Sequence, residues 1–221
     1  NIETVKKEFF KLKKNYKENK IPLLSTFEKK YKLSYSKKFV KTIKNNNNII
    51  LVGMGGSILG ARAIYSFLKK KIKKSFYFLD NLSEVDILKV KKLRTKKPIY
   101  IFISKSGNTL ETISNFNLIF QKRNQNCKKI FITEKKNNAI SEIANKLKSQ
   151  IIEHKNFIGG RYSVMSEVGM LPGELMNLKV KNFKNFNYLI NNKYFIQQLV
   201  TNVYCLYALY KKNKKNLIIL S

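Results

Sequence analysis

Three turns in this sequence combine glycines with hydroxyl or charged side chains, and two of them directly follow a short apolar run. The most polar is Ser104–Thr109, which reads Ser-Lys-Ser-Gly-Asn-Thr and is called the hydroxyl turn below. It separates the apolar run Ile99–Ile103 from a helix-like spacing of apolar residues that begins at Leu110. A strand that enters such a turn at the start of a helix is a common anion site, because backbone amides and the positive end of the helix face the ligand.

The composition of the hydroxyl turn indicates which anion would fit. Its candidate ligands are Ser104, Lys105, Ser106, Gly107, Asn108 and Thr109. Three hydroxyls, one ammonium and a flexible glycine-asparagine pair suit a phosphate dianion. The alternative is a helix cap rich in serine and threonine that binds no ligand. We favour the anion site, because a cap alone does not need six consecutive small or polar residues.

The second turn, Gly53–Gly60, follows the apolar run Ile49–Val52 and is called the glycine turn. Its glycines allow a ligand to approach the backbone closely and leave amides free. A dinucleotide fingerprint needs a third glycine where this chain has Ile58, although Asp80 after the next apolar run could mimic the ribose-binding acid. A nucleotide site and a tight turn without a ligand therefore remain alternatives for this stretch.

The third turn, Ile158–Ser163, places two glycines directly before Arg161 and is called the arginine segment. Such an arginine can present its guanidinium to a substrate oxyanion, and Ser163 could cap a following helix. The alternative is an arginine that is solvated or paired at the surface. His154 is the single histidine in the sequence, so neither a catalytic triad nor a metal site can be built around it, and we interpret it as structural or surface-exposed.

The formal net charge of +32 would ordinarily suggest a nucleic-acid partner. The lysines are spread along the whole chain, however, and they far outnumber the arginines that make bidentate contacts to bases and phosphates. The bias toward Lys, Asn, Ile, Phe and Tyr is typical of AT-rich codons. We therefore expect no nucleic-acid role, although the positive field would attract small anionic substrates.

The remaining composition indicates a globular, cytoplasmic protein. Cys127 and Cys205 are too few for a disulfide framework or a zinc site. No apolar run is long enough to cross a bilayer, so we expect no membrane partner. Because the sequence starts at Asn1 and stops at Ser221 within an apolar run, we expect a fragment of a longer chain.

Apolar runs and helix-like spacings alternate through the middle of the chain. We expect strands at 49–52, 76–79, 99–103, 129–132, 151–152 and 216–220. We expect helices at about 58–70, 83–93, 109–123, 138–147, 163–170 and 194–211, and one or two amphipathic helices within 1–45. Fully apolar strands separated by helices predict an α/β fold, a doubly wound parallel sheet whose ligands bind at the carboxyl ends of the strands.

These motifs together resemble the phosphoglucose isomerase family of the sugar isomerase (SIS) superfamily. The hydroxyl turn together with Glu111-Thr112, one residue beyond it, is similar to the phosphosugar loop of the superfamily. The stretches 53–62 and 156–169 resemble signatures of the family itself, and the three motifs occur in the same order within 51–172. The resemblance implies a flavodoxin-like SIS sheet with N-terminal helices. It divides the chain into a helical segment at 1–45, a first SIS domain at 46–180, and a linking helix with the start of a truncated second SIS domain at 181–221.

The resemblance also implies roles for the site residues. Gly56 and Ser57 would contact the sugar end of a hexose 6-phosphate, and the hydroxyl turn would hold its phosphate. Arg161 would act catalytically, by stabilising the charge on a cis-enediol(ate) intermediate. The implied reaction interconverts glucose 6-phosphate and fructose 6-phosphate in glycolysis and gluconeogenesis, in a cytoplasmic homodimer that uses no metal or nucleotide cofactor.

This sequence also departs from the family pattern. The glutamate base, the ring-opening histidine and the late lysine of the family have no match before Ser221, because Glu174 and His154 stand in other contexts. Glu167 lies in the third motif where the family usually has a small residue. We therefore expect an N-terminal part that is inactive by itself. The alternatives are a dual glucose/mannose phosphate isomerase, a non-catalytic SIS module that senses a phosphosugar, and a basic nucleic-acid binder.

Overall fold

The computed structural model describes residues 2–93, 97–120 and 127–214. The chain forms two compact units, one made of residues 32–183 and the other of residues 1–31 together with 184–221. The expected strand at 216–220 lies outside the described residues, as do the last residues of the helix expected at 109–123. In the described part, no helix is long and apolar enough to span a membrane.

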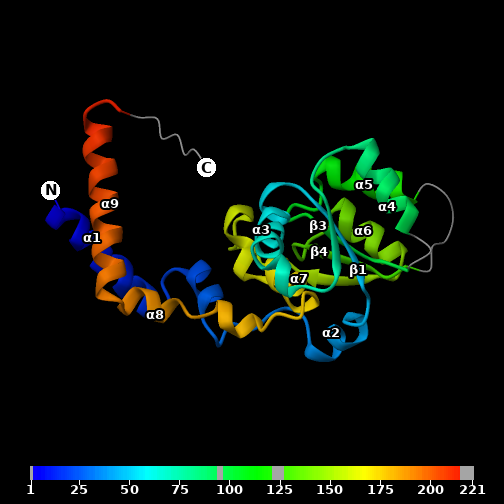
Figure 1. Ribbon diagram of the computed structural model, residues 1–221, viewed down its shortest axis with the longest axis horizontal. Coiled ribbons are helices and arrows are strands. Elements are labelled where there is room, and N and C mark those ends of the chain that lie inside the picture. Colours follow the sequence, from blue (N-terminus) through cyan, green and yellow to red (C-terminus); the bar gives the residue numbers. More distant parts are fainter. Residues whose placement is uncertain (1, 94–96, 121–126, 215–221) are drawn as a thin grey trace. The chain divides into compact units, whose positions relative to one another are not determined.

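The unit at 32–183 is built on one parallel sheet (Figure 1). Its strands are β1 (Asn48–Gly53), β2 (Ser75–Leu79), β3 (Ile99–Ile103), β4 (Lys129–Thr133) and β5 (Gln150–Glu153). All neighbouring strands pair in parallel, in the order β2-β1-β3-β4-β5. The five expected strands in this region and the flavodoxin-like order are thus confirmed.

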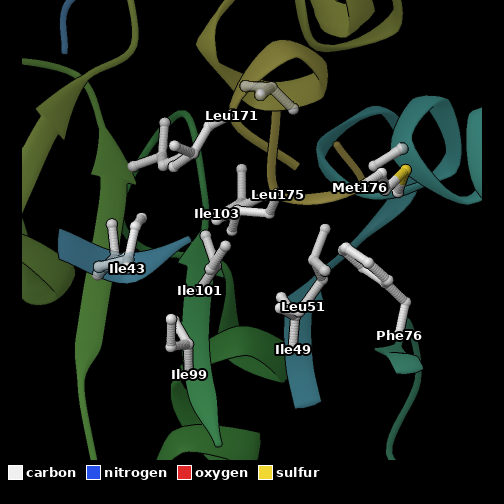
Figure 2. Packing of buried hydrophobic residues seen from close by; sticks show 14 of the residues in the cluster. Ile43, Ile49, Leu51, Phe76, Ile99, Ile101, Ile103, Leu171, Leu175 and Met176 are labelled. Atoms are coloured by element: carbon white, nitrogen blue, oxygen red, sulfur yellow. The ribbon is translucent and has the colours of Figure 1, made fainter. Parts of the chain in front are cut away.

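Helices cover both faces of this sheet. They are α2 (Lys37–Ile43), α3 (Leu59–Leu68), α4 (Glu84–Lys92), α5 (Leu110–Phe120), α6 (Ala139–Lys146) and α7 (Glu167–Leu175). Residues of α2, α3 and α7 pack with the strands in one buried cluster, and residues of α4, α5 and α6 pack in the other. In Figure 2, Ile101 and Ile103 of β3 point toward Leu171 and Leu175 of α7. The sheet is therefore doubly wound, and burial on both faces explains its continuous apolar strands.

Short 3₁₀-helices complete this unit. They are η2 (Gly55–Ser57), η3 (Lys69–Lys71), η5 (Gly160–Met165) and η6 (Val180–Phe183). The helix expected at 163–170 is wrong in its bounds, because η5 ends before Ser166 and α7 begins after it. Ser166 has an extended backbone, and its hydroxyl accepts a hydrogen bond from Val168 N as the cap of α7. The new helix then continues through Pro172 to Leu175.

The second unit contains α1 (Ile2–Lys17), η1 (Pro22–Phe27), α8 (Phe186–Asn191) and α9 (Lys193–Lys211). Helices α1 and α9 pack against each other, and Lys13 Nζ donates a hydrogen bond to Ile190 O at 3.3 Å. Lys184 Nζ donates to Thr26 O at 2.9 Å and lies over the ring of Tyr31. These contacts join the two ends of the described chain into one helical unit, which contains none of the three turns.

Candidate functional site

All three turns follow carboxyl ends of strands in the parallel sheet. The chain leaves β1 to form the glycine turn and leaves β3 to form the hydroxyl turn, and Gly53 pairs directly with Ile103 at the ends of these strands. The strand order reverses between β1 and β3. This is the topological switch point, where open α/β sheets bind their ligands.

The hydroxyl turn is closed by its own side chains. Ser104 has only 1% of its surface exposed, and its Oγ lies 2.8 Å from Thr109 Oγ1, within hydrogen-bond distance. The same Oγ accepts a hydrogen bond from Gly107 N at 3.1 Å. Ser106 and Asn108 are exposed, and Asn108 N donates to Ser106 Oγ at 3.2 Å. Ser104 therefore shapes the turn from inside, while Ser106 and Asn108 lie at its surface, before the N-terminus of α5.

The start of α6 supports the hydroxyl turn from the side of β4. Gly107 has a φ of +73°, and its carbonyl accepts a hydrogen bond from Ile140 N at 3.0 Å. Ala139 N donates to Asn108 Oδ1 at 3.0 Å. The free amides at the beginning of α6 thus bind the turn itself, which fixes its position relative to the sheet.

The glycine turn and the arginine segment lie in direct contact. The single proton of the Ser163 hydroxyl has two carbonyl acceptors within hydrogen-bond distance, Gly56 O at 3.0 Å and Gly160 O at 2.7 Å from Oγ. A Cβ on Gly56 would lie only 2.1 Å from Gly160 O, so the two backbones pass too closely for any side chain at this position. Ser57, half-buried beside this contact, ends η2. The serine that we expected to cap a helix instead joins two candidate site segments.

Arg161 follows this contact directly, near the beginning of η5. Its side chain is exposed, and the described residues place no carboxylate within ion-pair distance of it. The guanidinium is therefore available to a ligand, next to the backbone that touches Gly56.

Lys105 connects the hydroxyl turn with the loop that precedes the arginine segment. Its ammonium donates a hydrogen bond to Asn156 O at 2.8 Å and lies 3.5 Å from Glu134 Oε1. Lys105, Glu134 and Asn156 follow β3, β4 and β5 respectively, so the lysine side chain extends along the carboxyl edge of the sheet.

His154 directly follows β5 and is almost fully buried, with 1% of its surface exposed. Its Nδ1 lies 3.2 Å from Lys155 O, and its Nε2 has no hydrogen-bond partner in the described part of the chain. Burial lowers the pKa of the imidazole. The hydrogen bond to the Lys155 carbonyl opposes this shift, the charge on Lys105 adds to it, and the carboxylates of Glu167 and Glu134 oppose it. The structure therefore favours a neutral histidine.

We expect His154 to make the stability of the protein pH-dependent. The unfolded histidine takes up a proton near its ordinary pKa of 6.5, whereas the buried one resists protonation. The unfolded state thus binds more protons, and the free energy of unfolding should fall as the pH drops below 7, by at most about 1.4 kcal/mol per pH unit. Urea titrations between pH 7.5 and 5.5 would measure this decline, and it should be smaller in His154→Phe. An equal decline in both proteins would contradict the prediction.

The nucleotide alternative for the glycine turn finds no support in the geometry. The Asp80 carboxylate, which could have bound a ribose, forms an ion pair with Arg62 of α3. Within the described ranges, no three His, Cys, Asp or Glu side chains cluster in a way that could hold a metal ion.

Three residues that shape the site were not recognised from the sequence as parts of it: Glu134, Asn138 and, in its actual role, Ser163. Asn138 caps α6 through a hydrogen bond from Ser141 N to its Oδ1 and lies against Gly107. An asparagine that begins a helix is recognisable in a sequence. Its proximity to the hydroxyl turn is not, because that depends on β4 lying beside β3.

The chain is similar to known proteins in sequence and in fold. The phosphoglucose isomerase family model matches residues 24–217. Glucose-6-phosphate isomerase of Methanocaldococcus jannaschii is 36% identical over 137 residues, which cover 60% of this chain and 33% of that protein. Glucose-6-phosphate isomerase of Campylobacter jejuni is 34% identical over 146 residues, covering 62% of this chain and 36% of that protein. The chain thus spans about a third of the length of these relatives.

Solved structures share the fold at lower sequence identity. A hypothetical protein of Thermus thermophilus, TT0462, superposes with a TM-score of 0.61 at 18% identity, over 81% of this chain and 45% of that one. A glucose-6-phosphate isomerase of Chlamydia trachomatis gives a TM-score of 0.52 at 22% identity, over 66% of this chain and 29% of that one. These two likenesses concern the fold alone.

Proposed function

The chain belongs to the phosphoglucose isomerase family, and on that premise we propose that it carries the hexose 6-phosphate site of an enzyme that interconverts glucose 6-phosphate and fructose 6-phosphate. The observation that supports this most is the arrangement of the three turns. The hydroxyl turn and the glycine turn follow neighbouring strands at the switch point, and the arginine segment packs on the glycine turn. The turn that we propose for the phosphate, a close backbone approach and an available guanidinium therefore all lie near the carboxyl ends of the strands of one sheet.

In this proposal the hydroxyl turn holds the phosphate. Ser106 and Thr109 supply hydroxyls, Gly107 and Asn108 supply backbone at the start of α5, and the positive end of that helix favours the dianion. Ser104 keeps the turn closed through its contacts with Thr109 and Gly107. Lys105 adds positive charge at the edge of the turn.

The sugar end of the substrate would lie toward Gly56, Ser57 and Arg161. The reaction moves a proton between C1 and C2 through a cis-enediol(ate), so negative charge develops on the sugar oxygens. An available guanidinium stabilises such charge as an oxyanion hole does. This assigns Arg161 an electrostatic role and no proton transfer.

We propose that the general base is not among the described residues. Glu134, a carboxylate beside the hydroxyl turn, is paired with Lys105 and Lys136, and Glu167 is fully buried and accepts a hydrogen bond from Ser34 N at 2.8 Å. General base catalysis contributes roughly 10²- to 10⁴-fold. We therefore expect the 221-residue chain to bind substrate without converting it, and clear turnover of fructose 6-phosphate would contradict this.

Calorimetric titration of the chain with glucose 6-phosphate tests the binding site. We expect Ser106→Ala and Thr109→Val each to raise the dissociation constant at least about tenfold, because each removes a hydrogen bond to a charged group. Ser149→Ala is the matched control. Ser149 directly precedes β5, so it lies near the amino ends of the strands, away from the turns at their carboxyl ends. Unchanged binding in both site variants would refute the assignment of the hydroxyl turn.

The alternative functions predict different ligands and different effects of salt and of the variants on affinity. The pairing of Glu134 with lysines also fits a non-catalytic phosphosugar sensor, which would bind hexose phosphates while the complete protein shows no isomerase activity. A dual isomerase would bind mannose 6-phosphate as well. A nucleic-acid binder would lose affinity steeply with salt and would be indifferent to Ser106→Ala.

The same family membership supports a wider proposal for the complete protein. We propose that it acts in glycolysis and gluconeogenesis in the cytoplasm as a homodimer, with no nucleic-acid or membrane partner. Sedimentation of the purified protein would test the dimer.

A further inference from the structure

Three charged side chains form a connected group at the carboxyl ends of the strands, and only one of them, Lys105, belongs to one of the three turns. We call this group, Lys105, Glu134 and Lys136, the edge triad. Glu134 Oε2 lies 2.6 Å from Lys136 Nζ, and Glu134 Oε1 lies 3.5 Å from Lys105 Nζ. The side chain of Glu134 is only 14% exposed, so its charge is partly shielded from solvent.

The carboxylate is charged and firmly placed. The hydrogen bond from Lys136, together with the charge on Lys105, lowers the pKa of Glu134 despite its partial burial. Its backbone is fixed as well, since Glu134 N donates to Lys105 O at 3.2 Å. Glu134 thus contacts Lys105 through both its main chain and its side chain.

The side chain of Lys105 extends from the hydroxyl turn to the loop that precedes the arginine segment. Its ammonium binds Asn156 O at 2.8 Å, two residues before the arginine segment begins, while its main chain belongs to the hydroxyl turn. A lysine side chain loses much rotamer freedom when it is held in one position, so it needs partners that fix it. Asn156 O and Glu134 Oε1 supply two such partners from the neighbouring strand ends.

We propose that Glu134 is a positioning residue that holds Lys105 as a brace between the hydroxyl turn and the arginine segment. This inference rests on the proposed function, in which the hydroxyl turn binds the phosphate and the arginine segment carries Arg161 at the sugar end. The brace fixes the separation of the two ends of the site. Glu134 therefore contributes to the recognition of a hexose phosphate as a whole and much less to the recognition of phosphate alone.

At a pH at which both ligands are dianions, inorganic phosphate and glucose 6-phosphate separate this effect from simple electrostatics. Neutralising Glu134 strengthens the binding of any dianion nearby by a similar amount, since the Coulomb energy depends on charge and distance. Inorganic phosphate needs only the hydroxyl turn, whereas glucose 6-phosphate needs both ends of the site. The ratio of their dissociation constants cancels the shared electrostatic effect and retains the positioning effect.

The experiment is a calorimetric titration of the 221-residue chain with both ligands. In Glu134→Gln, we expect the dissociation constant of glucose 6-phosphate divided by that of inorganic phosphate to rise about fivefold, a size typical of groups coupled in one network. The matched control is Lys136→Met, which removes the other partner of the same carboxylate but leaves Lys105 and Glu134 in place, so it should change the ratio much less than Glu134→Gln does. Lys105→Met should raise the ratio as Glu134→Gln does, and the double variant should show no further increase.

The outcomes are distinguishable. A ratio that stays at the wild-type value in Glu134→Gln and in Lys105→Met would overturn the positioning role. Additive effects of these two variants would overturn it as well. If the wild-type chain binds inorganic phosphate and glucose 6-phosphate with equal affinity, or if it binds neither ligand, that result contradicts the proposed function itself. Thermal unfolding of each variant shows whether it is folded. If Glu134→Gln does not fold, the comparison of wild type with Lys105→Met tests the positioning role.

Discussion

Replacing Gly56 with alanine should destabilise the protein by about 3 kcal/mol, at the upper end of the usual cost of overpacking. The added Cβ would lie 2.1 Å from Gly160 O and 2.7 Å from Arg161 N. Both neighbours are backbone atoms, so no side chain can rotate away, and the arginine segment itself must move. Urea denaturation followed by circular dichroism would measure the loss. Because the displaced segment carries Arg161, we expect glucose 6-phosphate affinity to fall as well.

The matched control for this variant is Gly160→Ala, on the other side of the same contact. A Cβ on Gly160 would meet nothing within 4 Å. We expect its free energy of unfolding to change by less than about 1 kcal/mol. Equal stabilities for the two variants would show that the glycine turn and the arginine segment do not pack as described.

Replacing Gly107 with alanine should remove most of the phosphate affinity. A residue other than glycine at a φ of +73° is strained by about 1–2 kcal/mol. The Cβ would also lie 1.9 Å from Asn138 Oδ1 and 2.0 Å from Asn138 Cγ. That side chain caps α6, so it cannot move aside without breaking the cap. We expect the hydroxyl turn to shift and phosphate affinity to fall about 100-fold, the loss of two hydrogen bonds to a charged group.

Gly55→Ala separates backbone strain from this collision. Gly55 also has a positive φ, +52°, but a Cβ there would meet nothing within 4 Å. We expect it to lose stability through strain while its affinity for inorganic phosphate stays near wild type. Calorimetry with inorganic phosphate would compare the two variants. A phosphate affinity that survives in Gly107→Ala would mean that the turn does not need its observed shape.

Much of the fold could be predicted because the central strands β1, β3 and β4 are almost entirely apolar and buried. Runs such as Ile99–Ile103 have no polar side that could face water, so they predict a covered parallel sheet. The polar turns after these runs then fall at the carboxyl edge. The helix expected at 163–170 could not be placed correctly, because the extended backbone of Ser166 interrupts it and the Ser166 hydroxyl caps the new helix α7.

The contacts that hold the site together were less accessible to sequence reasoning. Lys105 and Glu134 are far apart in the chain, and their pairing depends on β4 lying beside β3. The contact between Gly56 and Gly160 likewise depends on where the chain goes after β5. Local patterns predict which residues form each turn, whereas partners across the sheet edge follow from strand order, which no local pattern specifies.

The hydrogen bond from Ser163 to Gly56 has a consequence for the order of folding, because 107 positions separate its two residues. Contacts between distant positions carry a large loop-closure entropy and form late. The five strands can pair before this bond exists, since each neighbouring pair closes a shorter loop. During synthesis, the glycine turn therefore stays without its partner until the last of these strands and the whole arginine segment have emerged. The contact on which the proposed sugar site depends is then formed after the sheet, as a final step in the maturation of this unit.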